Sequence, residues 1–190
     1  MKLLIVETAS DGSLQAVPGA DSAMLRPGEP VFVPDPAGAW RSRVMPAVRV
    51  SRLGMHINAR NARLYFDAIS AFHVMTPMNP MPGIPIGFID RTFSPGSFLP
   101  AAPPQDAVER TLEVSRAPIG SPAADVQTTS FSVDSIGAAA TLSEISQWCT
   151  LKTGDVLLFA DAAIDLGAPV LDTAIEAKID DTPVLNIRIK

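Results

Sequence analysis

Residues 21–55 read DSAMLRPGEPVFVPDPAGAWRSRVMPAVRVSRLGM, and this stretch decides the fold. Within it, residues 44–51 alternate valine and proline with other side chains, which predicts a strand with one better-buried face. The RLG sequence at 52–54 ends that strand, and two prolines at 30 and 34 enclose a second short strand, VFV. The stretch therefore predicts β structure interrupted by proline-rich turns.

Short alternating segments separated by proline and glycine continue along the chain and predict a β-rich architecture with few helices. Asn58 is a suitable cap for a short helix before a strand at 68–75. The run MTPMNPMPGIP at 75–85 is predicted to be a loop, because proline lacks the donor that a central strand needs. We also interpret residues 94–104 and 115–129 as connections.

The C-terminal third contains one predicted helix and one predicted hairpin. Ala138, Leu142, Ile145 and Cys149 have the spacing of a helical stripe, and Asp134 or Ser135 is available as the cap. A buried strand follows at 156–159. Alternating apolar residues at 173–179 and 185–189, separated by a turn, predict a closing β-hairpin.

Composition restricts the class of protein. A chain of 190 residues with 47% apolar and 18% charged residues fits one globular domain, 1–190. The net charge of −5, without a Lys/Arg cluster, argues against nucleic-acid binding. The apolar opening MKLLIV is too short for a signal peptide or a membrane span, so we expect a cytoplasmic protein with no membrane contact. The single Cys149 excludes an intrachain disulfide, and we interpret it as a small apolar residue on a buried helix face.

Several segments in the same order resemble the fumarylacetoacetate hydrolase family, especially its compact bacterial members. They are the 21–55 frame, RLYFDA at 63–68, FLP at 98–100, FSVD at 131–134 and ISQWCTLKTGDVLL at 145–158. The resemblance implies an α+β, β-dominated fold, a mixed β-roll or distorted β-barrel with a few short helices and a shortened N-terminal segment. It also implies a homodimer.

The resemblance further implies a metal-dependent reaction. In that family Mg²⁺ or Mn²⁺, held by three carboxylates, polarises a β-dicarbonyl or 2-oxoacid substrate while a histidine activates water. The family's E-x-E pair falls on Arg43 and Met45, and its third ligand falls on Val74. A cation, a thioether and an alkyl group replace three carboxylates. We therefore expect no bound metal and no other cofactor.

Other catalytic positions of the family also differ. The opening ETASDGSLQA at 7–16 contains no histidine, the substrate-loop lysine corresponds to Gly87, and the TGTP turn corresponds to residues 159–162. Asp90 does match the aspartate after the lysine. These losses favour a catalytically degenerate homologue that acts as a scaffold, a small-molecule binder or a partner of an active paralogue. The alternative is an active hydrolase, isomerase or decarboxylase of a small 2-oxoacid or acylpyruvate with an altered, metal-independent site.

We expect that the chain has no catalytic residue. The side chains whose chemistry could nevertheless support catalysis are those of His73, Asp90 and Asp161. His73 could pair with one of these carboxylates or with Asp67, or it could be a half-buried strand residue bonded to the backbone.

A further question is whether the chain has a ligand pocket at these positions. Arg43 could bind an anionic ligand, or it could be solvated or paired with Asp35. The candidate pocket walls could equally be gap-filling residues; they are Met75, Met78, Met81, Gly87 and Phe159.

Overall fold

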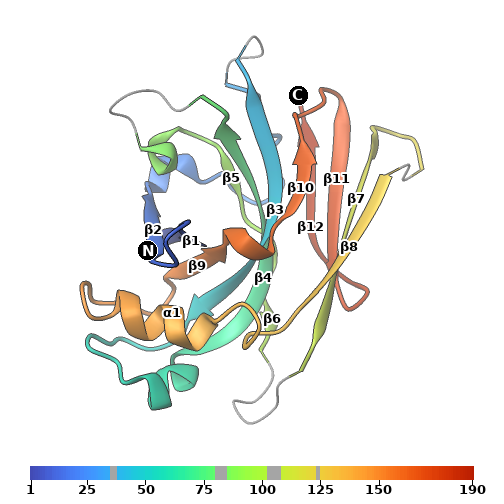
Figure 1. Cartoon of the computed structure of the whole chain (residues 1–190). Helices are drawn as coiled ribbons and strands as arrows, with labels where there is room; N and C mark the ends of the chain where they lie inside the picture. The colour runs from blue at the N-terminus through green and yellow to red at the C-terminus, as the bar shows by residue number, and fades with distance from the viewer. Residues whose placement is uncertain (35–37, 80–84, 102–107, 123–124) are drawn as a thin grey trace.

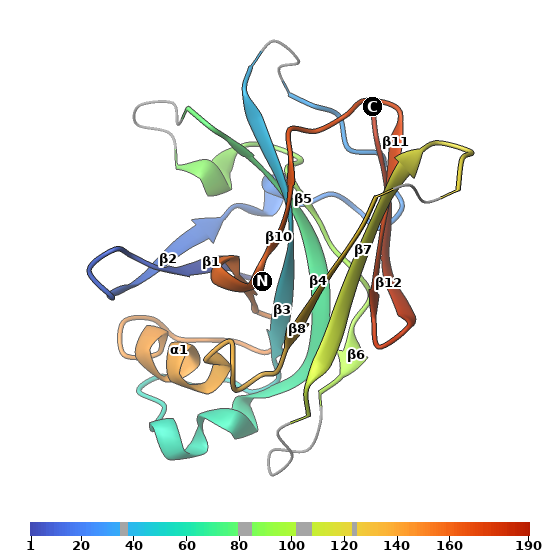
Figure 2. The same ribbon diagram turned by 45° about the vertical axis from the view of Figure 1, so that its right-hand side comes forward.

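Two β-sheets face each other, with one short α-helix across the lower end of the larger sheet (Figure 1). This arrangement comes from a computed structural model, which describes residues 1–34, 38–79, 85–101, 108–122 and 125–190. Strands dominate and the helices are short, as the sequence predicted. Figure 2, a view turned by 45°, shows the smaller sheet lying against one face of the larger.

The larger sheet has the strand order β2-β1-β9-β3-β4-β5, with β10 also paired to β3 and β6 to β4. The pair β1–β9 is parallel and the other pairs are antiparallel. Its strands are β1 (Leu3–Thr8), β2 (Leu14–Gly19), β3 (Trp40–Val50), β4 (Phe66–Pro77), β5 (Phe93–Ser94), β6 (Leu99–Pro100), β9 (Val156–Phe159) and β10 (Ile164–Gly167).

The smaller sheet is antiparallel in the order β12-β11-β7-β8. The predicted C-terminal hairpin is confirmed: β11 (Thr173–Ile179) pairs with β12 (Thr182–Ile189). The interpretation of 115–129 as a connection is wrong, because β7 (Arg110–Pro118) and β8 (Asp125–Phe131) occupy most of it. Strand β8 lies at the sheet edge with alternate side chains exposed, so it can be polar and still be a strand.

Short helices join these strands. Asn58 caps η2 (Ala59–Tyr65) by accepting a hydrogen bond from the Arg60 amide, as predicted. The helix α1 (Ala138–Ile145) begins later than predicted, after Gly137 at a φ of 66°. Its predicted caps have other partners, because Asp134 pairs with Arg63 and Ser135 bonds Ser132. The remaining helical turns are η1 (Asp21–Ala23), η3 (Ile86–Phe88) and η4 (Ala160–Ala162).

Both faces of the larger sheet are covered, and β3 has one better-buried face, as predicted, because its even-numbered residues 44–50 are all buried whereas Arg43 and Arg49 on the other face are half-buried. The first core lies between the two sheets and includes Val44 and Val48 of β3. The second core lies on the opposite face and includes Met45 and Ala47. Alternate residues of a strand point to opposite faces, and here each face has its own apolar cover. A strand at the centre of such a sheet carries apolar residues on both sides.

Three local predictions also differ from the structure. VFV is not a strand, since only Val31 forms an isolated bridge, to Ile189. The predicted 75–85 loop begins later because β4 continues to Pro77, and residues 80–84, including Met81, lie outside the described residues. Cys149 is half-buried beyond the end of α1 rather than on the helix. No helix in the described part of the chain is long and apolar enough to cross a bilayer.

Candidate functional site

The three positions that the resemblance assigns to metal ligands lie together on one face of β3 and β4. Arg43 is directly opposite Val74, and Met45 is opposite Phe72 in the same ladder. Because side chains alternate along a strand, Arg43, Met45 and Val74 project from the same face. The structure thus brings together the residues that the sequence alignment grouped.

This shared face is packed rather than open. Met45 and Val74 are each 0% exposed. They belong to the second core, where the large side chains around them are those of Ile5, Phe72, Phe93 and Leu158. Met45 and Val74 therefore contribute to apolar packing.

Arg43 is the one charged residue of the three, and it is half-buried. Its strand neighbour on β10 is Asp165, but that carboxylate accepts hydrogen bonds from Arg41. The Nε atom of Arg43 is buried without a hydrogen-bond partner among the described residues. Burial and the nearby Arg41 lower the pKa of Arg43, while Glu7 and Asp165 oppose that shift. The proposed partner Asp35 lies outside the described residues.

These residues do not fit a divalent metal ion. Mg²⁺ and Mn²⁺ prefer oxygen ligands, and this face offers a guanidinium, a thioether and an alkyl group. Within the described part of the chain, no three His, Cys, Asp or Glu side chains are grouped so that they could hold a metal ion. These side chains therefore give no support for a metal-dependent step at this position.

His73 projects to the opposite face from Val74, its neighbour in sequence, and is fully buried. Its Nε2 lies 2.8 Å from the Ser42 hydroxyl, and its Nδ1 has no hydrogen-bond partner in the described chain. Burial lowers the pKa of His73 to about 4, so the ring is neutral at pH 7. The expectation of a half-buried histidine bonded to the backbone is wrong.

The carboxylates considered as partners for His73 lie elsewhere. Asp67 is paired with Arg49, Asp90 is exposed, and Asp161 accepts a hydrogen bond from the Thr8 amide. None of them has a hydrogen bond or ion pair with the histidine ring. The structure therefore does not assemble a histidine–carboxylate pair for acid–base catalysis at His73.

Most of the candidate pocket walls also have other roles. Gly87 is buried against β2, where an added Cβ would lie 1.9 Å from the Pro18 carbonyl oxygen. Its own carbonyl accepts a hydrogen bond from the Ala20 amide. Met75 is fully buried in the first core, and Met78 is 62% exposed. The turn that corresponds to the family's substrate loop is thus packed against the N-terminal hairpin.

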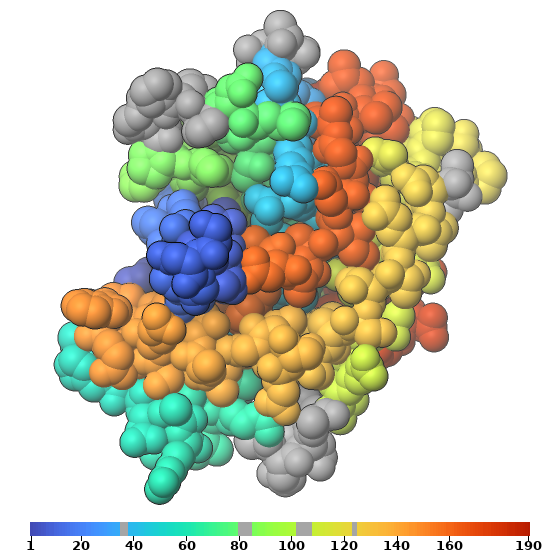
Figure 3. Space-filling view, viewed as in Figure 1, coloured from blue at the N-terminus to red at the C-terminus, as the bar shows by residue number. Residues whose placement is uncertain are grey.

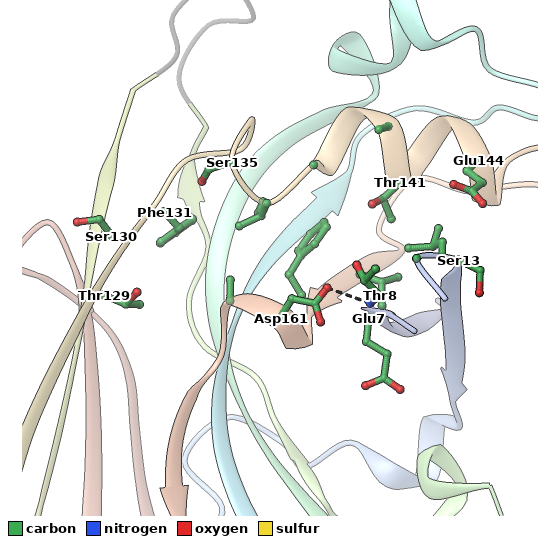
Figure 4. Close-up of a pocket in the computed structure, with 18 residues that line it drawn as sticks. Glu7, Thr8, Ser13, Thr129, Ser130, Phe131, Ser135, Thr141, Glu144 and Asp161 are labelled. Carbon is green, nitrogen blue, oxygen red and sulfur yellow. Dashed lines mark hydrogen bonds between the residues drawn. The ribbon is translucent and has the colours of Figure 1, made fainter. Parts of the chain in front are cut away.

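A cavity of about 640 Å³ lies at a different place, between the β1–β2 hairpin, β8, α1 and η4. Figure 3 shows the N-terminal segment, in dark blue, lying next to α1 and the 160–167 segment, both in orange. Two residues that the sequence singled out, Phe159 and Asp161, line this cavity. The sequence did not indicate the other lining residues, which include Thr8, Ser13, Thr141 and Glu144 (Figure 4).

Over its whole length the chain superposes on a fumarylpyruvate hydrolase from Pseudomonas aeruginosa, solved with Mn²⁺ and pyruvate, at a TM-score of 0.75 and 14% identity. The superposition covers 89% of that chain. A protein from Yersinia pestis described as belonging to the fumarylacetoacetate hydrolase family gives 0.73 and 15% identity over 100% of this chain and 93% of that one.

The chain has the fumarylacetoacetate hydrolase fold. A 5-carboxymethyl-2-hydroxymuconate delta-isomerase from Mycobacterium smegmatis is also similar, with a TM-score of 0.72 and 14% identity over 99% of this chain and 78% of that one. Comparisons of the sequence with protein-family models and with curated proteins gave no match. This fold is thus shared with hydrolases and isomerases at an identity too low to transfer an activity.

Proposed function

We propose that this chain is a catalytically degenerate relative of the fumarylacetoacetate hydrolase family that retains the scaffold for a binding role. The observation that supports this proposal is the shared face of Arg43, Met45 and Val74. Two of the three positions are fully buried in apolar packing, and the third carries a permanent positive charge.

Electrostatics explains why this face opposes the family's chemistry. A divalent cation placed beside the half-buried Arg43 would be repelled in a region that water screens poorly. Mg²⁺ would also have to leave its hydration shell without receiving oxygen ligands in return. A substrate that depends on metal coordination would therefore have no anchor on this face.

A direct test compares metal binding in this chain and in an established neighbour. Titration calorimetry with Mn²⁺ and Mg²⁺ should show no saturable binding here, whereas the Pseudomonas aeruginosa fumarylpyruvate hydrolase, solved with Mn²⁺, serves as the positive control. Turnover of acylpyruvates and oxaloacetate should equal the protein-free rate with either ion. Turnover that persists in a chelator would instead support the alternative, an active enzyme with a metal-independent site.

A restoration variant tests the assignment of the three positions. The triple change Arg43→Glu, Met45→Glu and Val74→Asp places three carboxylates on one face of β3 and β4. Buried carboxylates repel one another, so we expect the variant to melt at a lower temperature than the wild type in a chelator. Mn²⁺ should raise the melting temperature of the variant and leave that of the wild type unchanged. A folded variant whose melting temperature does not change with Mn²⁺ would contradict the assignment of these three positions to the family's metal ligands.

The proposed binding role has two forms, a small-molecule ligand or an active paralogue as partner. The cavity beside Phe159 and Asp161 supports the small-molecule form, since its volume of about 640 Å³ lies within the usual range for ligand sites. We also propose a homodimer, supported by the family resemblance, and light scattering coupled to size-exclusion chromatography tests it. A monomer at all protein concentrations would contradict the dimer.

A further inference from the structure

The cavity between α1, β8, η4 and the β1–β2 hairpin has a chemical character of its own. Among the residues that the structure describes, its lining contains three carboxylates, from Glu7, Glu144 and Asp161, and no Lys, Arg or His. Figure 4 shows that the Glu7 side chain runs away from α1, and its charge acts on Arg43 instead. The carboxylates that remain for a ligand are those of Glu144 on α1 and Asp161 on η4, which line the same cavity.

Neither of these two carboxylates is neutralised within the described chain. Asp161 accepts one hydrogen bond, from the Thr8 amide at 2.9 Å, through a single carboxylate oxygen. Glu144 has no ion pair or side-chain hydrogen bond with a described residue, and both side chains are exposed. Two unpaired negative charges across a partly enclosed space attract a cation and repel an anion.

Thr141 supplies a second, independent observation. It lines the cavity from α1 and is only 8% exposed, yet its hydroxyl makes no hydrogen bond with any described residue. The hydroxyl oxygen itself is not one of the buried atoms that lack a partner, so it reaches the open space of the cavity and can bond a partner there. A ligand in the cavity would provide that partner.

The apolar part of the lining limits the kind of cation. Phe131 and Phe159 are buried residues that line the same cavity, as do Leu14 and Ile136. A bare metal ion would gain nothing from these side chains, and no group of three His, Cys, Asp or Glu ligands occurs in the described chain. An organic cation with an apolar body uses both parts of the lining.

We propose that this cavity binds a small organic ammonium compound. Its amine lies between Asp161 and Glu144, a polar group of the ligand pairs with the Thr141 hydroxyl, and its apolar body packs against Phe131 and Phe159. The charge preference is opposite to that of a site for 2-oxoacids, which are anions. This inference names the ligand class for the small-molecule role proposed above and rests on that role.

Three probes of similar shape test the charge preference: 2-phenylethylamine, 2-phenylethanol and 3-phenylpropionate. Each is titrated into the whole chain labelled with ¹⁵N, and binding is followed by amide chemical shifts. The amine should shift residues of α1 and η4 and bind at least about tenfold more tightly than the alcohol, because it adds a charge-assisted contact that the alcohol lacks. The propionate should not bind. About 0.5 M salt should weaken binding of the amine more than binding of the alcohol.

Matched variants locate the site. Asp161→Asn and Glu144→Gln remove one charge each and change exposed side chains, so both variants should fold. Each should weaken amine binding about five- to tenfold, by a loss typical of a charged hydrogen bond at a partly exposed site. Asp165→Asn serves as the control, because Asp165 is an exposed aspartate outside the cavity lining. It should leave amine binding unchanged.

Several results would overturn the proposal. These are no binding of the amine up to about 10 mM, equal binding of the alcohol or the propionate, and unchanged binding in both cavity variants. Repeating the metal titration in Asp161→Asn and Glu144→Gln separates the face of Arg43 and Met45 from this cavity. The two proposals can therefore fail separately, since Mn²⁺ binding that persists in both variants would reject catalytic degeneracy without affecting the amine result.

Discussion

Lowering the pH should destabilise this protein through His73. The imidazole is fully buried, with Ser42 as its hydrogen-bond partner, and burial lowers its pKa to about 4 from the ordinary value of 6.5. In the unfolded chain the ring takes up a proton near pH 6.5, whereas in the folded protein it stays neutral until about pH 4. The neutral ring therefore contributes fully to stability above pH 6.5, and the contribution is lost as the pH falls toward 4.

The magnitude follows from the gap between the two pKa values. A shift of one unit corresponds to roughly 1.4 kcal/mol, so the full loss amounts to roughly 3 kcal/mol by about pH 4. At about pH 5 the unfolded state is almost fully protonated at this ring and the folded state is not, and the loss is about 2 kcal/mol. That is a large part of the stability of an ordinary domain.

Urea unfolding at about pH 7.5 and about pH 5 measures this loss in the wild type and in His73→Gln. The substitution has its own cost at both pH values, but it removes the titrating ring, so the acid-induced loss should be about 2 kcal/mol smaller than in the wild type. His56→Asn is the control for a histidine at an exposed position with a left-handed φ of 52°, which asparagine tolerates. An equal acid-induced loss in wild type and His73→Gln would refute the reasoning.

Two further substitutions test a close backbone contact at Gly87 and the hydrogen bonds of the buried Asp155 carboxylate. Gly87→Ala should destabilise the protein by about 2 kcal/mol, because its Cβ would lie 1.9 Å from the Pro18 oxygen and force η3 away from β2; an unchanged melting temperature would contradict this close approach. Asp155→Asn should cost about 2–3 kcal/mol in urea unfolding, because the buried carboxylate accepts hydrogen bonds from the amides of Lys2, at 2.6 Å, and Lys152, at 2.8 Å. A cost below about 0.5 kcal/mol would mean that the amide replaces the carboxylate at both partners.

Strands with one apolar face could be predicted from the sequence because their burial repeats every two residues. The C-terminal hairpin is the best example, since Ile175, Ala177 and Ile179 are buried and alternate with polar or less buried residues. The sequence predicted the central residues of β3 correctly, but it did not predict that an apolar core also covers the second face of this strand. That burial depends on elements far away in sequence, which cover the face of Met45.

Polar edge strands were missed for a related reason. The β8 sequence DVQTTSF has a weak apolar face, and β7 is the one strand that pairs with it in the described part of the chain, so its composition resembles that of a loop. The start of α1 was also misplaced, because Gly137 adopts a left-handed conformation and the nearby capping candidate Asp134 pairs with Arg63. In both cases a tertiary contact decides between conformations that the local sequence permits.

The alignment of the family's ligand positions grouped Arg43, Met45 and Val74, and the strand register places them together. Packing over Met45 and Val74 could not be read from the same residues, because it depends on side chains from other strands. The cavity was missed for a different reason. Its walls come from segments that begin near residues 6, 129 and 159, each of which contributes a few residues with no local motif.

The parallel pairing of β1 with β9 has a consequence for folding. Leu3 pairs with Val156, and the Lys2 amide bonds to Asp155 across a sequence separation of 153 residues. During synthesis the first hairpin therefore has no partner on its β9 side until most of the chain has been made. Such non-local pairing slows folding and leaves an apolar strand edge open to self-association in the meantime. Yield in cells should thus depend on chaperone capacity more strongly than the stability of the finished fold suggests.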